Sequence, residues 1–141
     1  MTRRPADLLR EAYSEPRWSP EAVDRYLQHV DPDVDWRAME GAADDVGVMH
    51  GHEGLRRYLE EWLELFDDLE LRIGEIVELD DTEALAAMRL SARGKGSGVE
   101  TGIDFAVHFQ FRNDLIVRGR EYATLDEARA AAEAAQTARR S

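Results

Sequence analysis

The chain has 141 residues with an ordinary hydrophobic content of 43%, and 18 basic against 30 acidic side chains give a net charge of −12 at pH 7. This length supports a single domain over residues 1–141, and no apolar run is long enough to span a membrane. The acidic balance argues against nucleic acids and anionic membranes as partners, and the absence of cysteine excludes disulfides and thiolate chemistry. We expect a cytoplasmic protein, because no apolar signal-peptide stretch follows the basic first residues.

The first thirty residues predict two helices. A short helix is expected over residues 6–13. Ser19 followed by Pro20 is typical of an N-cap and a first helical residue. Apolar side chains then recur at positions i, i+3, i+4 and i+7 from Val23 to Val30, which predicts an amphipathic helix that ends before Asp31.

A third, longer helix is the strongest helical prediction. A short strand over residues 34–39 and a polar loop over residues 41–45 are expected before it. The helix starts after Gly51 and carries one wide apolar stripe, formed by Leu55, Tyr58, Leu59, Trp62, Leu65 and Phe66.

The second half of the chain predicts an antiparallel sheet. The apolar pattern over residues 69–79 changes phase near Gly74, which is typical of a β-bulge. The alanines of residues 84–92 suit a helix as well as a strand, but the alternate glycines of residues 94–98 favour a hairpin tip. Residues 103–111 alternate strictly between apolar and other side chains, which is the best strand pattern in the chain.

A last strand and a capped helix complete the chain. Turns are expected at residues 80–81 and 113–114, and the last strand over residues 115–123. Thr124 and Glu127 have the spacing of a capping box ahead of an alanine-rich helix, which we expect to cover the sheet and to fray from residue 136.

This order of elements favours an α+β fold over a parallel βαβ fold. We expect one curved antiparallel, or mixed, sheet that wraps around the long helix as a cone, with the N-terminal helices and the C-terminal helix packed beside it. The open mouth of such a cone would lead to a pocket for a small molecule.

Five segments carry a family resemblance: residues 10–13 (REAY), 32–36 (PDVDW), 51–55 (GHEGL), 93–98 (RGKGSG) and 111–118 (FRNDLIVR). In this order and spacing the chain resembles the SnoaL-like polyketide cyclase branch of the nuclear transport factor 2-like, or ketosteroid isomerase-like, superfamily, with its core over about residues 6–130. The resemblance implies the cone fold. It does not imply one activity, because the superfamily includes isomerases, cyclases, hydrolases, dehydratases and proteins that only bind.

The resemblance allows the catalytic positions of steroid isomerases to be compared with the residues of this chain. Such enzymes use a tyrosine of the first helix and two pocket carboxyl groups, one as base and one as hydrogen-bond donor. Tyr13 falls at the tyrosine position, but the base position falls at Trp36 and the donor position at Val107. Neither side chain can exchange a proton, so this chemistry is disfavoured. The histidine that many relatives carry at the donor position is displaced to His108, which places it on the opposite face of the strand.

Side-chain alternation indicates a different acid. The resemblance implies a carboxyl group on the last strand, where the polyketide cyclases have their proton acceptor. If Val107 faces the cone, Glu121 on the neighbouring strand faces it too. Burial among Trp36, Phe105 and Phe109 would raise the pKa of Glu121 and favour it as a base. The alternative is that Glu121 only pairs with an arginine at the sheet edge.

The predicted catalytic groups are therefore Glu121 as proton acceptor, Tyr13 as hydrogen-bond donor to a substrate oxygen, and His50 as an assisting group at the pocket rim. The predicted substrate-binding residues are Trp36, Met39, Trp62, Phe66, Phe105, Val107 and Phe109, with Trp18 and Met49 as further lining candidates. Plain core packing is the competing explanation for these side chains, and we favour it for Trp62 and Phe66.

Two apparent metal motifs fail on their ligands, and the proposed chemistry needs no metal and no organic cofactor. His50 and His52 have no third ligand at a recognisable spacing. The acidic residues at 31, 33 and 35 resemble the start of a calcium loop, but the required glycine and glutamate are absent at 36 and 42.

Two functions stay open. The first is a cofactor-independent enzyme of isomerase, cyclase or hydrolase type, most simply one that transfers a proton, acting on a small apolar or polycyclic molecule. The second is a non-catalytic ligand-binding or dimerisation module, favoured by the missing acids at Trp36 and Val107. Both predict a homodimer through the outer face of the sheet, which would carry Met88, Leu90, Ala106, His108, Gln110, Arg118, Arg120 and Tyr122.

Overall fold

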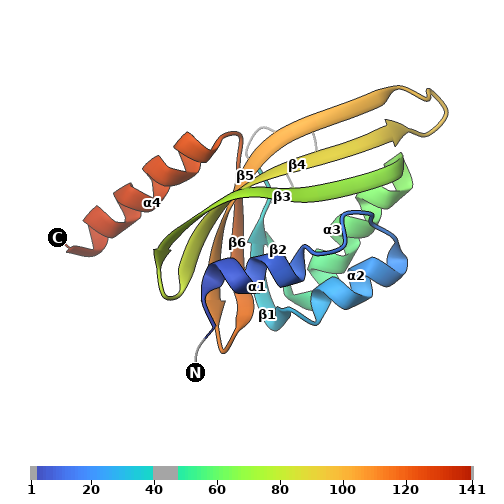
Figure 1. The fold of residues 1–141 in the computed structure, drawn as a ribbon. Helices are drawn as coiled ribbons and strands as arrows, with labels where there is room; N and C mark the ends of the chain where they lie inside the picture. Colours follow the sequence, from blue (N-terminus) through green and yellow to red (C-terminus); the bar gives the residue numbers. More distant parts are fainter. Residues whose placement is uncertain (1–2, 40–47, 141) are drawn as a thin grey trace.

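The computed structural model describes residues 3–39 and 48–140, and it confirms the predicted α+β fold (Figure 1). In chain order the elements are α1 (Pro5–Ala12), α2 (Pro20–Leu27), β1 (Val30–Arg37), β2 (Val48–His50), α3 (Gly51–Leu65), β3 (Phe66–Asp80), β4 (Glu83–Gly94), β5 (Glu100–Arg112), β6 (Leu115–Tyr122) and α4 (Leu125–Arg140). The loop expected over residues 41–45 lies outside the described residues. No helix in the described ranges is both long and apolar enough to cross a bilayer.

The strands form one sheet in the order β2-β1-β6-β5-β4-β3. The strands from β3 to β6 make an antiparallel meander, and β1 joins this meander by pairing parallel to β6, so the sheet is mixed. Side chains of α1, α2 and α3 share the main core with one face of the sheet, whereas α4 packs on the opposite face (Figure 1). The helices on the first face close the cone around its interior.

One predicted helix end is wrong, and one residue of a predicted helical stripe lies outside its helix, each because strand pairing begins earlier than the apolar pattern suggests. Helix α2 ends at Leu27, and Val30 instead opens β1, where it pairs with Ile116 of β6. Helix α3 ends at Leu65, and Phe66 instead opens β3, where it pairs with Gly94. In both places the backbone groups are satisfied by a ladder between residues far apart in sequence, which outweighs the local helical period.

The predicted helix caps at Ser19 and Thr124 and the turn at residues 113–114 are confirmed, whereas the turn predicted at residues 80–81 lies at residues 81–82, because Asp80 still pairs with Glu83. The Ser19 hydroxyl accepts a hydrogen bond from the Ala22 N–H at 3.1 Å, and the Thr124 hydroxyl accepts one from the Glu127 N–H at 3.1 Å. Gly96 and Gly98 have φ values of 84° and 68° at the β4–β5 tip, a conformation that glycine adopts without steric cost. The pairing of β3 with β4 shifts register between Ile73 and Ile76, which is the expected irregularity at Gly74.

Helix α4 covers the outer face of the sheet, as expected, through a second apolar cluster. This cluster is formed by Leu85, Ala106, Ala128 and Ala132, with Val77, Leu79, Tyr122 and Leu125 packed around it. The helix continues to Arg140, and the expected fraying from residue 136 stays a prediction. Near this end the Arg139 guanidinium lies 3.9 Å from the Glu83 carboxylate on β4, which ties the last turns to the sheet.

The side-chain directions on β5 and on the second half of β6 follow the predicted alternation, but those on β4 do not. At the start of β6, Ile116 and not Val117 belongs to the interior core, because the pairing with β5 shifts register between Gln110 and Phe111. Met88 and Leu90, expected on the outer face, line the interior of the cone. The physical reason is register, because Met88 pairs with Phe105 and Leu90 with Ile103, and residues directly opposite each other share a face. Ala106, which was predicted to lie in a dimer surface on the outer face, is instead buried against α4 of the same chain.

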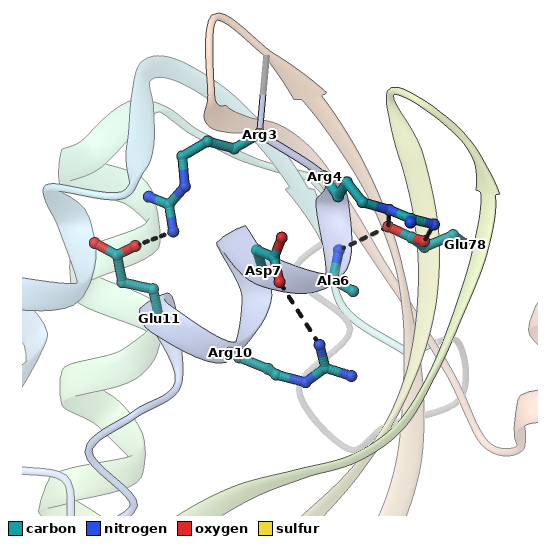
Figure 2. Close-up of polar contacts among 7 residues, drawn as sticks. All are labelled: Arg3, Arg4, Ala6, Asp7, Arg10, Glu11 and Glu78. Atoms are coloured by element: carbon teal, nitrogen blue, oxygen red, sulfur yellow. Dashed lines mark hydrogen bonds and ion pairs between the residues drawn. The ribbon is translucent and has the colours of Figure 1, made fainter. Parts of the chain in front are cut away.

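Charged contacts fix α1 to the sheet (Figure 2). Arg4 pairs with the Glu78 carboxylate of β3, and the Ala6 N–H donates a hydrogen bond to the same carboxylate at 3.2 Å. Because Ala6 lies in the first turn, Glu78 also satisfies one of the free N–H groups at the helix start. The pairs of Arg3 with Glu11 and of Asp7 with Arg10 are exposed and contribute little. This docking holds Tyr13, the residue that follows α1, at the interior of the cone.

Candidate functional site

An apolar cavity of about 330 Å³ lies inside the cone, between α3 and the concave face of the sheet. Its lining residues are Tyr13, Trp18, Tyr26, Trp36, Met39, Leu55, Tyr58, Leu59, Trp62, Leu69, Leu71, Met88, Leu90, Ile103, Phe105, Val107 and Glu121. Among these described lining residues, Glu121 is the one carboxylic acid. The described wall of the cavity therefore combines a large aromatic surface with one ionisable carboxyl group, which is the composition typical of a small-molecule site.

Glu121 enters the cavity from β6, where it pairs with Val107 of β5. The Trp36 indole N–H donates a hydrogen bond to Glu121 Oε2 at 2.8 Å, and the Tyr58 hydroxyl lies 3.1 Å from each carboxylate oxygen. Burial raises the pKa of Glu121 above the ordinary glutamate value, and the hydrogen bonds from Trp36, Tyr58 and the Met39 backbone oppose this rise. The carboxylate is thus a stronger base than an exposed glutamate.

Gly119 explains how Trp36 reaches this carboxylate. Trp36 on β1 pairs directly with Gly119 on β6, and the indole ring lies over the glycine. A Cβ atom on Gly119 would be 2.3 Å from two carbons of the ring, closer than any side chain tolerates. The missing side chain therefore lets Trp36 cross β6 and donate to Glu121, two residues further along the strand.

A pair of buried tyrosines forms the second polar group of the cavity. The hydroxyl oxygens of Tyr13 and Tyr26 lie 2.6 Å apart, so one hydroxyl donates to the other. Burial raises the pKa of both tyrosines, and the negative charge of Glu121 raises them further. Both hydroxyls are therefore neutral donors at physiological pH, and the pair carries one more proton than its mutual hydrogen bond uses.

The raised pKa of Glu121 predicts a pH-dependent difference in stability between the wild-type protein and Glu121→Gln. In the wild-type protein, protonation of Glu121 stabilises the folded state, because the folded state binds this proton more tightly than the unfolded state does. This stabilisation is fully present below the unfolded-state pKa, near 4.5, and is lost as the pH rises through the higher folded-state pKa. The free energy of unfolding of Glu121→Gln, minus that of wild type, should therefore increase with pH across this window. Urea denaturation at a series of pH values measures it, and a difference that falls with pH would contradict the assignment.

The structure brings most of the predicted site residues together. Glu121, Tyr13, Trp36, Met39, Trp62, Phe105 and Val107 all line the cavity, as does the further candidate Trp18. Three other predicted lining residues do not line it. Phe109 and Met49 belong to the buried core, and Phe66 stacks on Trp62 with ring centroids 5.7 Å apart.

His50, predicted at the pocket rim, lies on the other side of the sheet. It pairs across β2 and β1 with Asp35, and its Nδ1 atom lies 2.6 Å from Asp35 Oδ1. Asp35 precedes Trp36 in a strand, and since Trp36 points into the cone, Asp35 and His50 point away from it. This geometry removes the basis for an assisting role of His50 in the cavity.

Tyr58 and Tyr26 were not among the predicted site residues. Tyr58 belongs to the apolar stripe of α3, one turn before Trp62, and Tyr26 belongs to the stripe of α2. Both positions indicated a buried face, but nothing in the sequence shows that their hydroxyls meet Glu121 and Tyr13. A buried tyrosine needs a hydrogen-bond partner, which is the signal that could have marked them.

The described residues contain no group of three or more histidine, aspartate or glutamate side chains that could hold a metal ion. His52, part of the apparent metal motif, has its Nε2 atom 2.7 Å from the Val30 carbonyl oxygen. That contact connects the first turn of α3 to β1.

Comparisons with known proteins agree on the fold. A family model described as a SnoaL-like domain matches residues 10–119. None of the curated proteins matches the chain significantly.

Solved structures superpose on most of the chain. TerC co-crystallised with polyporic acid does so with a TM-score of 0.70 at 16% identity, covering 89% of this chain and 95% of that chain. A putative SnoaL-like polyketide cyclase from Jannaschia sp. CCS1 gives 0.69 at 14% identity, covering 91% and 94%. A hypothetical protein from Catenulispora acidiphila with a ketosteroid isomerase-like fold, in complex with trimethylamine, gives 0.66 at 13% identity, covering 87% and 88%. At these identities the likeness shows the cone fold and leaves the chemistry to the site itself.

Proposed function

This chain belongs to the SnoaL-like domain family, and from that premise we propose that it binds a small, largely apolar cyclic molecule in the cone and accepts a proton from it on Glu121. The observation that carries the proposal is Glu121, the one carboxyl group among the described lining residues, which has a raised pKa in a largely apolar, aromatic cavity. Two structural relatives were crystallised with small molecules, polyporic acid and trimethylamine, which is consistent with ligand binding by this fold.

The proposed reaction is proton abstraction from a carbon next to a carbonyl group, as in isomerisation or cyclisation. The C–H proton moves to the Glu121 carboxylate, and the electron pair of that bond moves onto the carbonyl oxygen as an enolate. The Tyr13–Tyr26 pair supplies a neutral hydroxyl to hold the enolate oxygen. In an isomerisation the proton then returns from Glu121 to another carbon of the same molecule. In a cyclisation the enolate carbon forms a bond to a second carbonyl carbon of the molecule, and the proton moves from Glu121 to the oxygen of that carbonyl. Neither reaction consumes an external oxidant or reductant.

The second candidate function is ligand binding without catalysis. The observation that favours it is that both oxygens of Glu121 already accept hydrogen bonds from Trp36 and Tyr58 within the protein. A carboxylate with these partners can also serve to hold two aromatic rings in the cavity wall.

The ligand-binding step is tested by filling the cavity. Ile103 lines the cavity and is partly buried, whereas Val99 lies four residues earlier with 61% of its surface exposed. We expect Ile103→Trp to weaken the binding of hydroxylated polycyclic ketones by about tenfold or more, because the added ring occupies their space. The matched variant Val99→Trp should bind as wild type does.

Binding is measured by isothermal titration calorimetry, and proton abstraction by deuterium uptake from D₂O into the bound ketone. Equal affinities for both tryptophan variants would overturn the placement of the ligand in the cone. If the wild-type protein binds hydroxylated polycyclic ketones but none of them takes up deuterium, the non-catalytic function is favoured.

A further inference from the structure

A second depression, of about 200 Å³, lies on the outer face of the sheet, over β2, β1 and β6. It is lined by Asp35, Arg37, Val48, His50, Arg118, Gly119 and Arg120. The charged residues alternate along their strands with the cavity groups: Arg37 follows Trp36, and Arg120 precedes Glu121. The sheet therefore separates this depression from the cone cavity, and the two are independent sites.

The three arginines of this depression are unusual for the chain. Most of its other arginines have an acidic partner, as expected at a net charge of −12: examples are Arg4 with Glu78, Arg56 with Asp24, Arg89 with Asp104 and Arg93 with Glu100. In residues 3–39 and 48–140, no carboxylate lies within ion-pair distance of Arg37, Arg118 or Arg120. Three arginines thus line one depression without an ion-pair partner among the described residues.

The acidic groups that the structure describes near these arginines have other partners. Asp35, the one carboxylate in the described lining, lies against the His50 ring at 2.6 Å. On the β5 side, Arg120 pairs in register with His108, which lies 2.9 Å from the Glu83 carboxylate. Glu83 also receives a hydrogen bond from Gln110 at 3.2 Å and lies beside Arg139. Within residues 3–39 and 48–140, the positive charge of these three arginines is therefore not balanced by an acidic partner.

We propose that this depression binds a phosphate group, either as free phosphate or on a small phosphorylated molecule. Guanidinium groups form paired hydrogen bonds with the oxygens of phosphate, and several arginines suit its tetrahedral shape and double charge better than a planar carboxylate does. The depression is larger than one phosphate group, which leaves room for the organic part of a phosphomonoester. Because the chain as a whole is acidic, binding depends on these local charges and weakens as salt is raised.

The test is an NMR titration of the full chain with inorganic phosphate and with phenyl phosphate, against sodium chloride at equal ionic strength. We expect saturable shifts at the backbone amides of Arg118, Gly119 and Arg120 with both phosphates, and none with chloride. Tighter binding of phenyl phosphate would indicate a phosphorylated molecule, and equal binding would indicate free phosphate.

Arg118→Gln combined with Arg120→Gln should weaken phosphate binding by about tenfold or more, because two of the three guanidinium groups are lost. The matched control is Arg89→Gln combined with Arg93→Gln, which removes two exposed arginines of β4 that have acidic partners, and it should bind as wild type does. Arg37→Gln provides a second test if the double variant does not fold. Unchanged phosphate affinity in these variants would overturn the proposal. It would also be overturned if phosphate caused no shifts and the wild-type protein were a dimer that Arg118→Gln combined with Arg120→Gln converts to a monomer, because the arginines would then serve a subunit contact.

This experiment is independent of the proton-transfer proposal. Glu121→Gln changes the opposite face of the sheet and should leave phosphate binding unchanged, so either proposal can fail without the other.

Discussion

Replacing Glu121 by glutamine is expected to slow deuterium exchange into a bound ketone by about 10²–10⁴-fold, the usual contribution of a general base. The variant is close in size, and its amide oxygen can still accept the hydrogen bonds that Trp36 and Tyr58 donate in the wild-type protein. The ligand should therefore still bind with nearly unchanged affinity, so the loss should appear in the exchange rate. Mass spectrometry of the ketone after incubation in D₂O measures that rate.

The control for this change is Glu100→Gln, which neutralises an exposed carboxylate of β5 outside the cavity and should leave the exchange rate at the wild-type value. The wild-type rate should also rise with pH through the raised pKa of Glu121, because only the ionised carboxylate accepts a proton. Undiminished exchange in Glu121→Gln would show that the base lies elsewhere.

The sequence was most informative where one physical rule decides a side-chain direction. Strict alternation in β5 predicts that Val107 and Phe109 face inward and His108 outward. Transfer of this direction to the neighbouring strand predicts that Glu121 faces inward as well, and the register of Val107 with Glu121 agrees. The carboxyl group of the cavity could therefore be identified without coordinates.

Prediction failed where the deciding contact joins residues distant in sequence. The inward direction of Met88 depends on its pairing with Phe105, and the mixed alanine-rich pattern of β4 does not reveal that register. The outward position of His50 depends on its pairing with Asp35 across β1 and β2. The hydrogen bond from Tyr58 to Glu121 joins α3 to β6, 63 residues apart, and no local pattern encodes it.

Two phenylalanines of β5 have different roles, one in core packing and one in ligand contact. The sequence alone does not separate these roles. Phe109 is fully buried, and its ring centroid lies 5.9 Å from that of Tyr13 and 6.0 Å from that of Trp36. Phe105 points to the same side of the strand, but it is only partly buried and lines the cavity. The first side chain therefore supports the two aromatic groups of the site from behind, and the second faces the ligand.

Phe109→Ala is expected to lower the free energy of unfolding by about 3–5 kcal/mol, because the substitution leaves a cavity among rings that cannot close it. Phe105→Ala should lower it by only about 1–2 kcal/mol, since part of that ring is already unburied in the wild-type protein. Urea denaturation followed by circular dichroism measures both values. Ligand affinity, measured without urea where both variants are folded, should show the opposite order, with Phe105→Ala losing more affinity than Phe109→Ala. Equal losses of stability would contradict the division of this strand into a packed core and a cavity wall.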